Sequence, residues 1–278
     1  MKKALKSAEE ILEKNGILDP RFEAEQLILK IANCSKTDIM LGAKSLDEAK
    51  EKELETALGR RIKGEPLQYI IGEWEFYSLP FFVGEGVLIP RADTEILVDS
   101  AIKFLEGKSG KRVIDLCSGS GCIAVAVSKN SPENKVFALE KYDRAFEFLE
   151  KNIKRNEAAV TPIKGDVFDG TDERFDLILS NPPYIKPEAM KTLQKEVTFE
   201  PETALAGGED GLIFYRAIID KWADKLNLGG ALMVEIGFDQ KEEVMALMEA
   251  AGLRNITPKK DINGLWRVII GTRDALRG

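Results

Sequence analysis

Histidine is absent from this 278-residue sequence. A chain without imidazole can use neither a Ser-His-Asp triad nor a Cys-His pair, and it offers no histidine ligand to a metal ion. Cysteine is scarce too: Cys34, Cys117 and Cys122 lack the spacing of a metal site, and we interpret them as reduced thiols of a cytosolic protein. We therefore expect no bound metal and a reaction that proceeds without an imidazole base.

Long apolar runs and an excess of positive charge are missing as well. Residues 1–20 alternate charged and apolar positions instead of forming a secretory signal, and no run of about 20 apolar residues that could span a membrane follows. The net charge of −7 and the pI near 5.1 argue against broad binding to nucleic acid, although they leave room for a local basic groove. The expected location is the cytoplasm, with no membrane partner.

The first part of the chain has helical periodicity. Apolar residues recur at spacings of three and four over residues 2–63, and Asp19-Pro20 is a typical helix start, an N-cap followed by proline. Ser45 to Glu48 has the spacing of a capping box, and the helix that it opens is predicted to end at Gly64. We predict a small helical bundle over residues 1–71. Its interpretation as a substrate-recognition domain rests on fold-level analogy. The alternative is that the bundle has only a structural role in packing.

A different pattern begins at Gly72. Alternating polar and apolar residues predict a β-hairpin connector over residues 72–87. Beyond Gly110, segments typical of strands and helices alternate, which predicts an α/β domain over residues 88–278, built on a doubly wound, mainly parallel sheet. Strands are expected at 112–116, 136–140, 175–180, 231–236 and near Ile256 and Val268, with helices at 121–129, 142–156, 211–226 and 240–251.

The predicted strand at 175–180 ends in a segment that we call the acceptor turn: Asn181, Pro182, Pro183 and Tyr184. Ligands bind at this edge of open α/β sheets. The two prolines have no backbone N–H, so the polar groups of the turn are mostly acceptors, namely the Asn181 side-chain oxygen and main-chain carbonyls. Two acceptors can hold a planar NH2 group while Tyr184 covers one face. A proline-rich turn that only closes the strand is the alternative.

Three other strand ends carry candidate cofactor ligands. The first strand runs into a glycine-containing loop whose backbone can approach a ligand closely, formed by Cys117, Ser118, Gly119, Ser120 and Gly121. Glu140 ends the next strand and is placed to accept hydrogen bonds from both hydroxyls of a ribose. At the third strand end, Asp166 could accept from an adenine amino group while Val167 packs on the ring. Together these residues indicate a nucleoside-containing cofactor, although each also has an ordinary structural interpretation.

In kind and order, these motifs resemble those of class I S-adenosylmethionine-dependent methyltransferases that modify planar nitrogens, which have a Rossmann-like fold. Leu88 to Glu95 resembles the L-I-P-R-P-D/E-T-E segment of the peptide chain release factor glutamine methyltransferases, the PrmC/HemK family, and Phe199 to Leu205 resembles their F-E-P-x-x-A-L segment. The helical region and the hairpin match as well, so the resemblance covers nearly the whole chain. Cys117 stands where the family usually has glycine, and Ala92 where it usually has proline.

The resemblance implies a protein-glutamine methyltransferase that acts in translation termination. Its cofactor would be S-adenosylmethionine, held by the strand-end residues named above together with Asn181. Its substrate would be the glutamine of the Gly-Gly-Gln motif in peptide chain release factors, methylated on the side-chain amide nitrogen. Asn181, Pro182 and Tyr184 would be catalytic, and Pro183 would join them in binding the substrate.

The chemistry of the acceptor turn agrees with this implication. Positive charge moves from sulfur to nitrogen during transfer, and carbonyl oxygens aimed at the NH2 group become better partners as that charge grows. We therefore expect that no general base is essential. The acidic balance and the lack of an evident basic surface argue against a nucleic-acid partner, and we expect a monomer. Two alternatives are a methyltransferase acting on an exocyclic amine of a nucleic-acid base, which would need base flipping in a duplex, and a non-catalytic cofactor-binding or adaptor protein.

Overall fold

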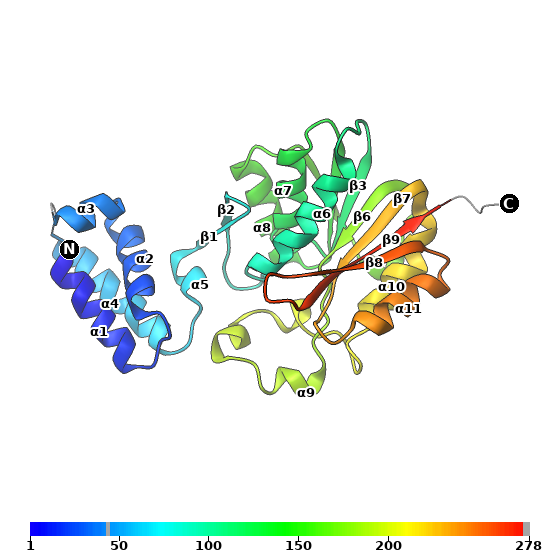
Figure 1. Cartoon of the computed structure of the whole chain (residues 1–278). Helices are drawn as coiled ribbons and strands as arrows, with labels where there is room; N and C mark the ends of the chain where they lie inside the picture. The colour runs from blue at the N-terminus through cyan, green and yellow to red at the C-terminus, as the bar shows by residue number, and fades with distance from the viewer. Residues whose placement is uncertain (43–44, 275–278) are drawn as a thin grey trace. The chain divides into compact units, whose positions relative to one another are not determined.

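The computed structural model describes residues 1–42 and 45–274 (Figure 1). The chain divides into two compact units. Met1–Glu73 and Gln194–Phe199 form one, which we call the helical unit, while Trp74–Leu193 and the residues from Glu200 onward form the other, which we call the sheet unit. The short segment Gln194–Phe199 thus belongs to the helical unit, although its flanking residues belong to the sheet unit. Within the described ranges, no helix is long and apolar enough to cross a membrane.

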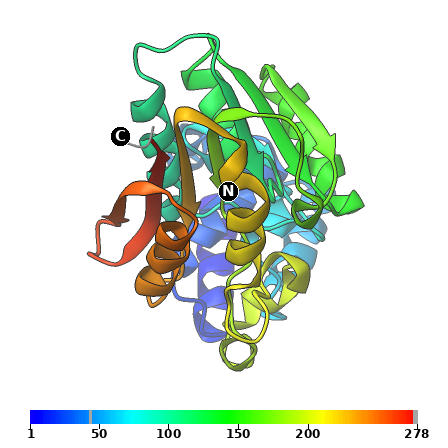
Figure 2. The same cartoon turned by 90° about the vertical axis from the view of Figure 1, so that its right-hand side faces the viewer.

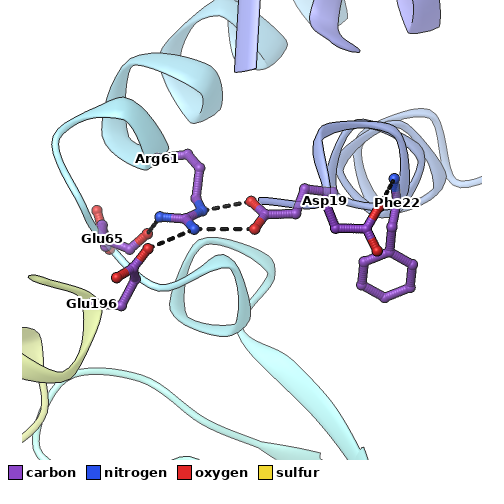
Figure 3. Close-up of polar contacts among 6 residues, drawn as sticks. Asp19, Phe22, Arg61, Glu65 and Glu196 are labelled. Carbon is purple, nitrogen blue, oxygen red and sulfur yellow. Dashed lines mark hydrogen bonds and ion pairs between the residues drawn. The ribbon is translucent and has the colours of Figure 1, made fainter. Parts of the chain in front are cut away.

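The helical unit confirms the predicted N-terminal helices. Within residues 2–63, the range with helical periodicity, they are α1 (Lys2–Lys14), α2 (Pro20–Ala32), α3 (Lys36–Leu41) and α4 (Glu48–Ile62). A further short helix, α5 (Leu67–Ile71), lies beyond that range, and the 3-10 helix η3 (Lys195–Phe199) joins the unit from later in the chain. The Asp19 carboxylate accepts a hydrogen bond from the backbone N–H of Phe22 (Figure 3). Pro20 is the first residue of α2, as predicted. Apolar side chains on the inner faces of these helices, such as Leu12 and Ile28, are fully buried and form the core of this unit.

One predicted cap is wrong. Asp47, not Ser45, caps α4, because its carboxylate lies directly before the helix and accepts from the Lys50 N–H at 2.9 Å. A capping box forms instead at α3, where Ser35 and Asp38 bond each other's backbone N–H groups. Residues 43–44, which the sequence also placed in the helical region, lie outside the described residues.

A buried arginine fastens η3 to the helices of its unit (Figure 3). The Arg61 guanidinium donates to both carboxylate oxygens of Glu23, at 2.5 and 3.0 Å, and to one oxygen of Glu196 at 2.9 Å. Its side chain is only 6% exposed, so water screens these contacts weakly. Arg61 therefore joins α2, α4 and η3 through one charged group.

The sheet unit confirms the predicted doubly wound, mainly parallel sheet (Figure 2). Its strands run in the order β5-β4-β3-β6-β7-β9-β8, and of these seven strands β9 alone runs opposite to the others. β1 (Glu73–Phe76) and β2 (Leu79–Phe82) form the predicted hairpin. The other strands are β3 (Arg112–Leu116), β4 (Lys135–Glu140), β5 (Val160–Lys164), β6 (Phe175–Ser180), β7 (Leu226–Glu235), β8 (Arg254–Lys260) and β9 (Trp266–Arg273).

Helices cover both faces of this sheet, because successive residues of its buried strands point to opposite sides. Val113 and Leu177 pack with α6 (Glu95–Leu105), α7 (Cys122–Asn130) and α8 (Asp143–Arg155). Ile114 and Ile178 pack with α10 (Ile213–Trp222) and α11 (Lys241–Ala250). The short helices are α9 (Pro187–Met190), η1 (Ala92–Thr94), η2 (Val167–Asp169), η4 (Glu202–Ala204) and η5 (Ala223–Lys225).

The predicted helix at 211–226 is too long. It ends at Trp222, and Leu226 is already the first residue of β7, where it pairs with Phe175 of β6. β7 therefore starts five residues before the predicted Ala231. The carboxyl ends of the parallel strands meet at one edge of the sheet, which brings the predicted site segments together.

Candidate active site

A cleft of about 940 Å³, including its open mouth, lies at the carboxyl ends of β3, β4, β5 and β6, a size typical of small-molecule sites. All of its lining residues belong to the sheet unit. Most of them come from the four strand ends and from the two segments around Leu88 and Pro201 that resemble family motifs, and helices α7, α8 and α10 supply the rest. The predicted residues on its wall are Cys117, Ser118, Gly119, Ser120, Glu140, Asp166, Val167, Asn181 and Pro183.

The loop after β3 turns through unusual backbone conformations. Cys117 and Gly119 have φ values of +58° and +54°, in the left-handed region that glycine adopts at no steric cost. The departure of Cys117 from the family's glycine therefore places a β-carbon, and a thiol, in a strained position on the cleft wall. Gly121 has another role: a β-carbon there would lie 2.4 Å from Leu149, so this glycine lets α7 pack against α8.

Glu140 holds the loop and still offers acceptors to the cleft. One of its carboxylate oxygens accepts from the Gly119 N–H and the other from the Tyr142 N–H, both at 2.8 Å. Each oxygen of an ionised carboxylate can accept about two hydrogen bonds, so each carboxylate oxygen of Glu140 can accept one more. The residue that sequence reasoning assigned to a ribose therefore also fixes the neighbouring loop.

Asp166 pairs with a lysine that sequence reasoning missed. Its carboxylate lies 2.7 Å from the Lys141 ammonium and accepts from the Phe168 N–H at 3.1 Å. Burial opposes ionisation of Asp166, but these two partners outweigh it and lower the pKa. Val167 and Phe168 add an apolar wall beside this charge, with the Phe214 ring edge-on to that of Phe168 at 5.3 Å.

The acceptor turn is only partly on the cleft wall. Asn181 and Pro183 line the cleft, whereas Pro182 is buried and the Tyr184 hydroxyl points to β7, 3.5 Å from a carboxylate oxygen of Glu235. Burial raises the pKa of Tyr184, so its hydroxyl stays protonated at neutral pH. The Asn181 side-chain nitrogen donates to the Thr94 hydroxyl at 3.1 Å. Thr94 and Glu235 were both missed by sequence reasoning.

Glu235 is a buried carboxyl group beneath the acceptor turn. Burial raises its pKa to about 7, opposed by the Thr94 hydroxyl, Arg267 and the Asn181 amide, which favour the charged form. Its Oε2 atom has no hydrogen-bond partner among the described residues. The available sequence signal was a single acidic residue at the end of an apolar strand.

A second buried glutamate joins the two segments that resemble family motifs. The Glu200 side chain, 2% exposed, accepts from the Ile89 N–H at 3.0 Å and pairs with the Arg91 guanidinium. This contact holds the segment after Glu200 beside the segment after Ile89. Pro201, Thr203 and Ala204 line the cleft as a result.

Known proteins match this chain over most of its length. Residues 3–72 match the PrmC N-terminal domain family and residues 93–213 the methyltransferase small domain family. The release factor glutamine methyltransferase of Thermodesulfovibrio yellowstonii is 39% identical over 253 residues, which cover 89% of this chain and 91% of the relative. The protein of that name from Geobacter sulfurreducens is 39% identical over 263 residues, which cover 94% and 92%.

Solved structures share the fold of the sheet unit. The hMettl16 catalytic domain superposes with a TM-score of 0.59 at 14% identity, covering 83% of this chain and 84% of that chain. At this identity the likeness establishes the architecture alone.

Proposed function

The chain belongs to the release factor glutamine methyltransferases, and from this premise we propose that it transfers a methyl group from S-adenosylmethionine to the side-chain amide nitrogen of the Gly-Gly-Gln glutamine in peptide chain release factors. One observation carries the proposal. Asn181 lies on the cleft wall with its side-chain nitrogen bonded to Thr94, so its oxygen is left to accept from an incoming NH2 group.

The cleft fits S-adenosylmethionine. Its sulfonium is an activated methyl donor. The unused acceptor places on Glu140 suit ribose hydroxyls, and the Asp166 carboxylate beside the apolar Val167 suits an aminopurine. Cys117, Ser118, Gly119 and Ser120 would border the methionine part, with Asn181 at the reacting end. Gly121 contributes by packing α7.

The acceptor turn would hold and aim the glutamine side chain. Asn181 Oδ1 and the Pro182 carbonyl accept the two amide hydrogens, which points the nitrogen in one direction. Both oxygens bind more strongly as positive charge grows on the nitrogen, and Pro183 and Tyr184 shape the turn around it. No side chain is required to remove a proton before transfer.

The protein would act in the cytoplasm on release factors, as a monomer. We propose that residues 1–71 grip the release factor, residues 72–87 connect, and residues 88–278 carry the chemistry.

Labelling tests the function directly. The purified protein is incubated with labelled S-adenosylmethionine and, in separate arms, release factor, duplex DNA or ribosomal RNA. Label should appear on release factor alone and disappear when its Gly-Gly-Gln glutamine is replaced by asparagine. Label on a nucleic acid would overturn the proposal in favour of base methylation, and no label in any arm would favour an adaptor protein.

Removing the Asn181 amide tests the mechanism. We expect Asn181→Ala to lower kcat by about 100- to 1,000-fold, the range seen when a group that stabilises transition-state charge is removed. The affinity for S-adenosylmethionine, measured by calorimetry, should change only a few-fold. The matched control is Asn130→Ala, since Asn130 bonds within α7. Comparable turnover by Asn181→Ala and wild type would contradict the assigned role.

A further inference from the structure

The orientation of the Asn181 amide decides whether the acceptor turn works. An asparagine side chain has an oxygen on one side and an NH2 group on the other, and a rotation of 180° exchanges them. In the structure the nitrogen donates to the Thr94 hydroxyl at 3.1 Å, so the oxygen faces away from Thr94. The opposite rotamer would present an NH2 group to an NH2 group. Something must therefore hold Asn181 in the productive orientation.

Thr94 cannot do this alone, because a hydroxyl both donates and accepts. It could donate to a rotated Asn181 as readily as it accepts from the observed one. Its orientation becomes fixed when a neighbouring group can only accept. Glu235 is an acceptor-only group beside the turn: the residue is 3% exposed, and its Oε1 accepts from the hydroxyl of Tyr184 at 3.5 Å. The Thr94 hydroxyl and the Asn181 amide lie near enough to favour its charged form. Within the described chain, its Oε2 atom still has no hydrogen-bond partner.

We propose that Glu235 is a positioning residue: through Thr94 it holds the Asn181 oxygen toward the substrate and so selects a carboxamide over a carboxylate. Glu235 does not touch the reacting atoms. Its negative charge orients the Thr94 proton toward itself, which leaves the Thr94 oxygen to accept from Asn181. A glutamate in place of the substrate glutamine would bring its carboxylate oxygens against the Asn181 oxygen, where neither side can donate a hydrogen bond. The buried negative charge of Glu235 would repel it further. The inference rests on the proposed function and deepens it.

The surroundings of Glu235 should make turnover depend on pH. The charged groups nearby are Asp93 and Arg267, which pair with each other at 3.0 Å. The neutral hydroxyls of Tyr184 and Tyr215 and the buried thiol of Cys122 also lie close to Glu235. Because the pKa of Glu235 is raised to about 7, the carboxylate gains a proton as the pH falls through neutrality and ceases to be acceptor-only. Turnover should fall on that side, while binding of S-adenosylmethionine should not.

Three variants test the proposal on full-length protein with intact release factor. Glu235→Gln keeps the shape but adds a donor, Thr94→Val removes the hydroxyl, and Thr94→Ser retains it. We expect the first two to lower kcat by about 10- to 100-fold, the effect of losing a hydrogen bond to a charged group, and Thr94→Ser to stay within about 3-fold. The fall in kcat between pH 7.5 and 6 should vanish in Glu235→Gln. Release factor carrying glutamate in place of the substrate glutamine should inhibit Glu235→Gln more strongly than it inhibits wild type.

The outcomes separate this inference from the proposed function. Wild type that fails to methylate release factor would refute the function itself. Active wild type with Thr94→Val equal to Thr94→Ser, or with an unchanged pH profile in Glu235→Gln, would refute only the positioning role. A parallel loss of cofactor affinity and Tm would show a structural role and refute it as well. Ser100→Ala is the matched control, because Ser100 bonds within α6, and it should behave as wild type.

Discussion

At the scale of single residues, Asp115 is a fully buried acid that the mechanism does not use. Among the described residues, neither of its carboxylate oxygens has a hydrogen-bond partner. Burial raises its pKa from 3.8 to about 8, and the nearby Ser118 hydroxyl and Ala124 N–H favour ionisation too weakly to offset this. The folded protein thus keeps a proton on Asp115 at neutral pH, whereas the unfolded chain releases it.

This difference sets the sign of a pH effect on stability. Where the folded state holds more protons, the free energy of unfolding falls as the pH rises. The contribution of Asp115 is present below pH 3.8 and is lost as the pH rises toward about 8. We expect Asp115→Asn to show a smaller loss of stability between pH 5 and 8 than wild type, measured by urea unfolding of both proteins at each pH.

A second aspartate gives the matched control. The pKa of Asp176 is lowered: burial opposes ionisation, but the Arg112 N–H, Asn227 and Lys111 outweigh it. Its carboxyl is therefore ionised in both states above pH 5, and Asp176→Asn should leave the slope between pH 5 and 8 as in wild type. Equal slopes for wild type and Asp115→Asn would contradict the assignment.

At the scale of structural elements, Gly211 lets the start of α10 approach the acceptor turn. Its φ is +76°, and a β-carbon would lie 2.6 Å from both the Tyr184 carbonyl oxygen and the Gln240 side-chain nitrogen. That nitrogen donates to the Tyr184 and Gly211 carbonyls, so Gln240 ties the two segments together. We expect Gly211→Ala to displace the turn and lower kcat by at least about 10-fold, because small misplacements of a catalytic group are costly.

Gly252 controls for backbone strain alone. Its φ is +84°, and within the described chain nothing lies within 4 Å of its would-be β-carbon. Gly252→Ala should lose about 1–2 kcal/mol of stability and keep its kcat. Assays of both variants well below their Tm isolate the contact. An unchanged kcat in Gly211→Ala would show that the acceptor turn tolerates the displacement and would contradict this role of Gly211.

The contacts of Arg61 predict a large difference between adjacent arginines of α4. Arg61 bonds Glu23 and Glu196 with a 6% exposed side chain, while Arg60 pairs with Glu65 at 44% and 20% exposure. We expect Arg61→Ala to destabilise the helical unit by about 2–4 kcal/mol, because two carboxylates lose their partner. Arg60→Ala should cost no more than about 1 kcal/mol. Urea unfolding checks both, and equal losses would show that burial adds nothing to the Arg61 contacts.

Local patterns predicted some elements to the residue and misjudged others. β3 and β6 have the predicted bounds because each is a short apolar run between clear breaks. The predicted helix before β7 was too long, because Leu226 continues the apolar pattern of that helix. Leu226 is a strand residue only because it pairs with Phe175, which is far away in sequence. Thr94 was missed as a partner of Asn181 for the same reason: 87 residues separate them.

At the scale of the whole molecule, we expect cofactor binding and release-factor binding to be separable between the two units. The cleft is lined by residues of the sheet unit, while the helical unit is proposed to grip the release factor. Removal of residues 1–73 should leave the affinity for S-adenosylmethionine within a few-fold. Methylation of intact release factor should fall by at least about 10-fold through loss of binding energy from remote contacts.

A short peptide containing Gly-Gly-Gln provides the internal control for that truncation. The peptide lacks the surface that the helical unit would grip, so the full-length and truncated proteins should methylate it equally. Full activity of the truncated protein on intact release factor would count against the gripping role.

The path of the chain also orders the events of biosynthesis. Residues 1–73 leave the ribosome early, but the helical unit is incomplete until Phe199 has been made, 199 − 73 = 126 residues later. At roughly 5–20 residues per second, that interval is about 6 to 25 s. Arg61 spends it without Glu196, as β3 to β6 emerge in between. The nascent helical unit therefore acquires its last piece only after most of the parallel strands have been synthesised.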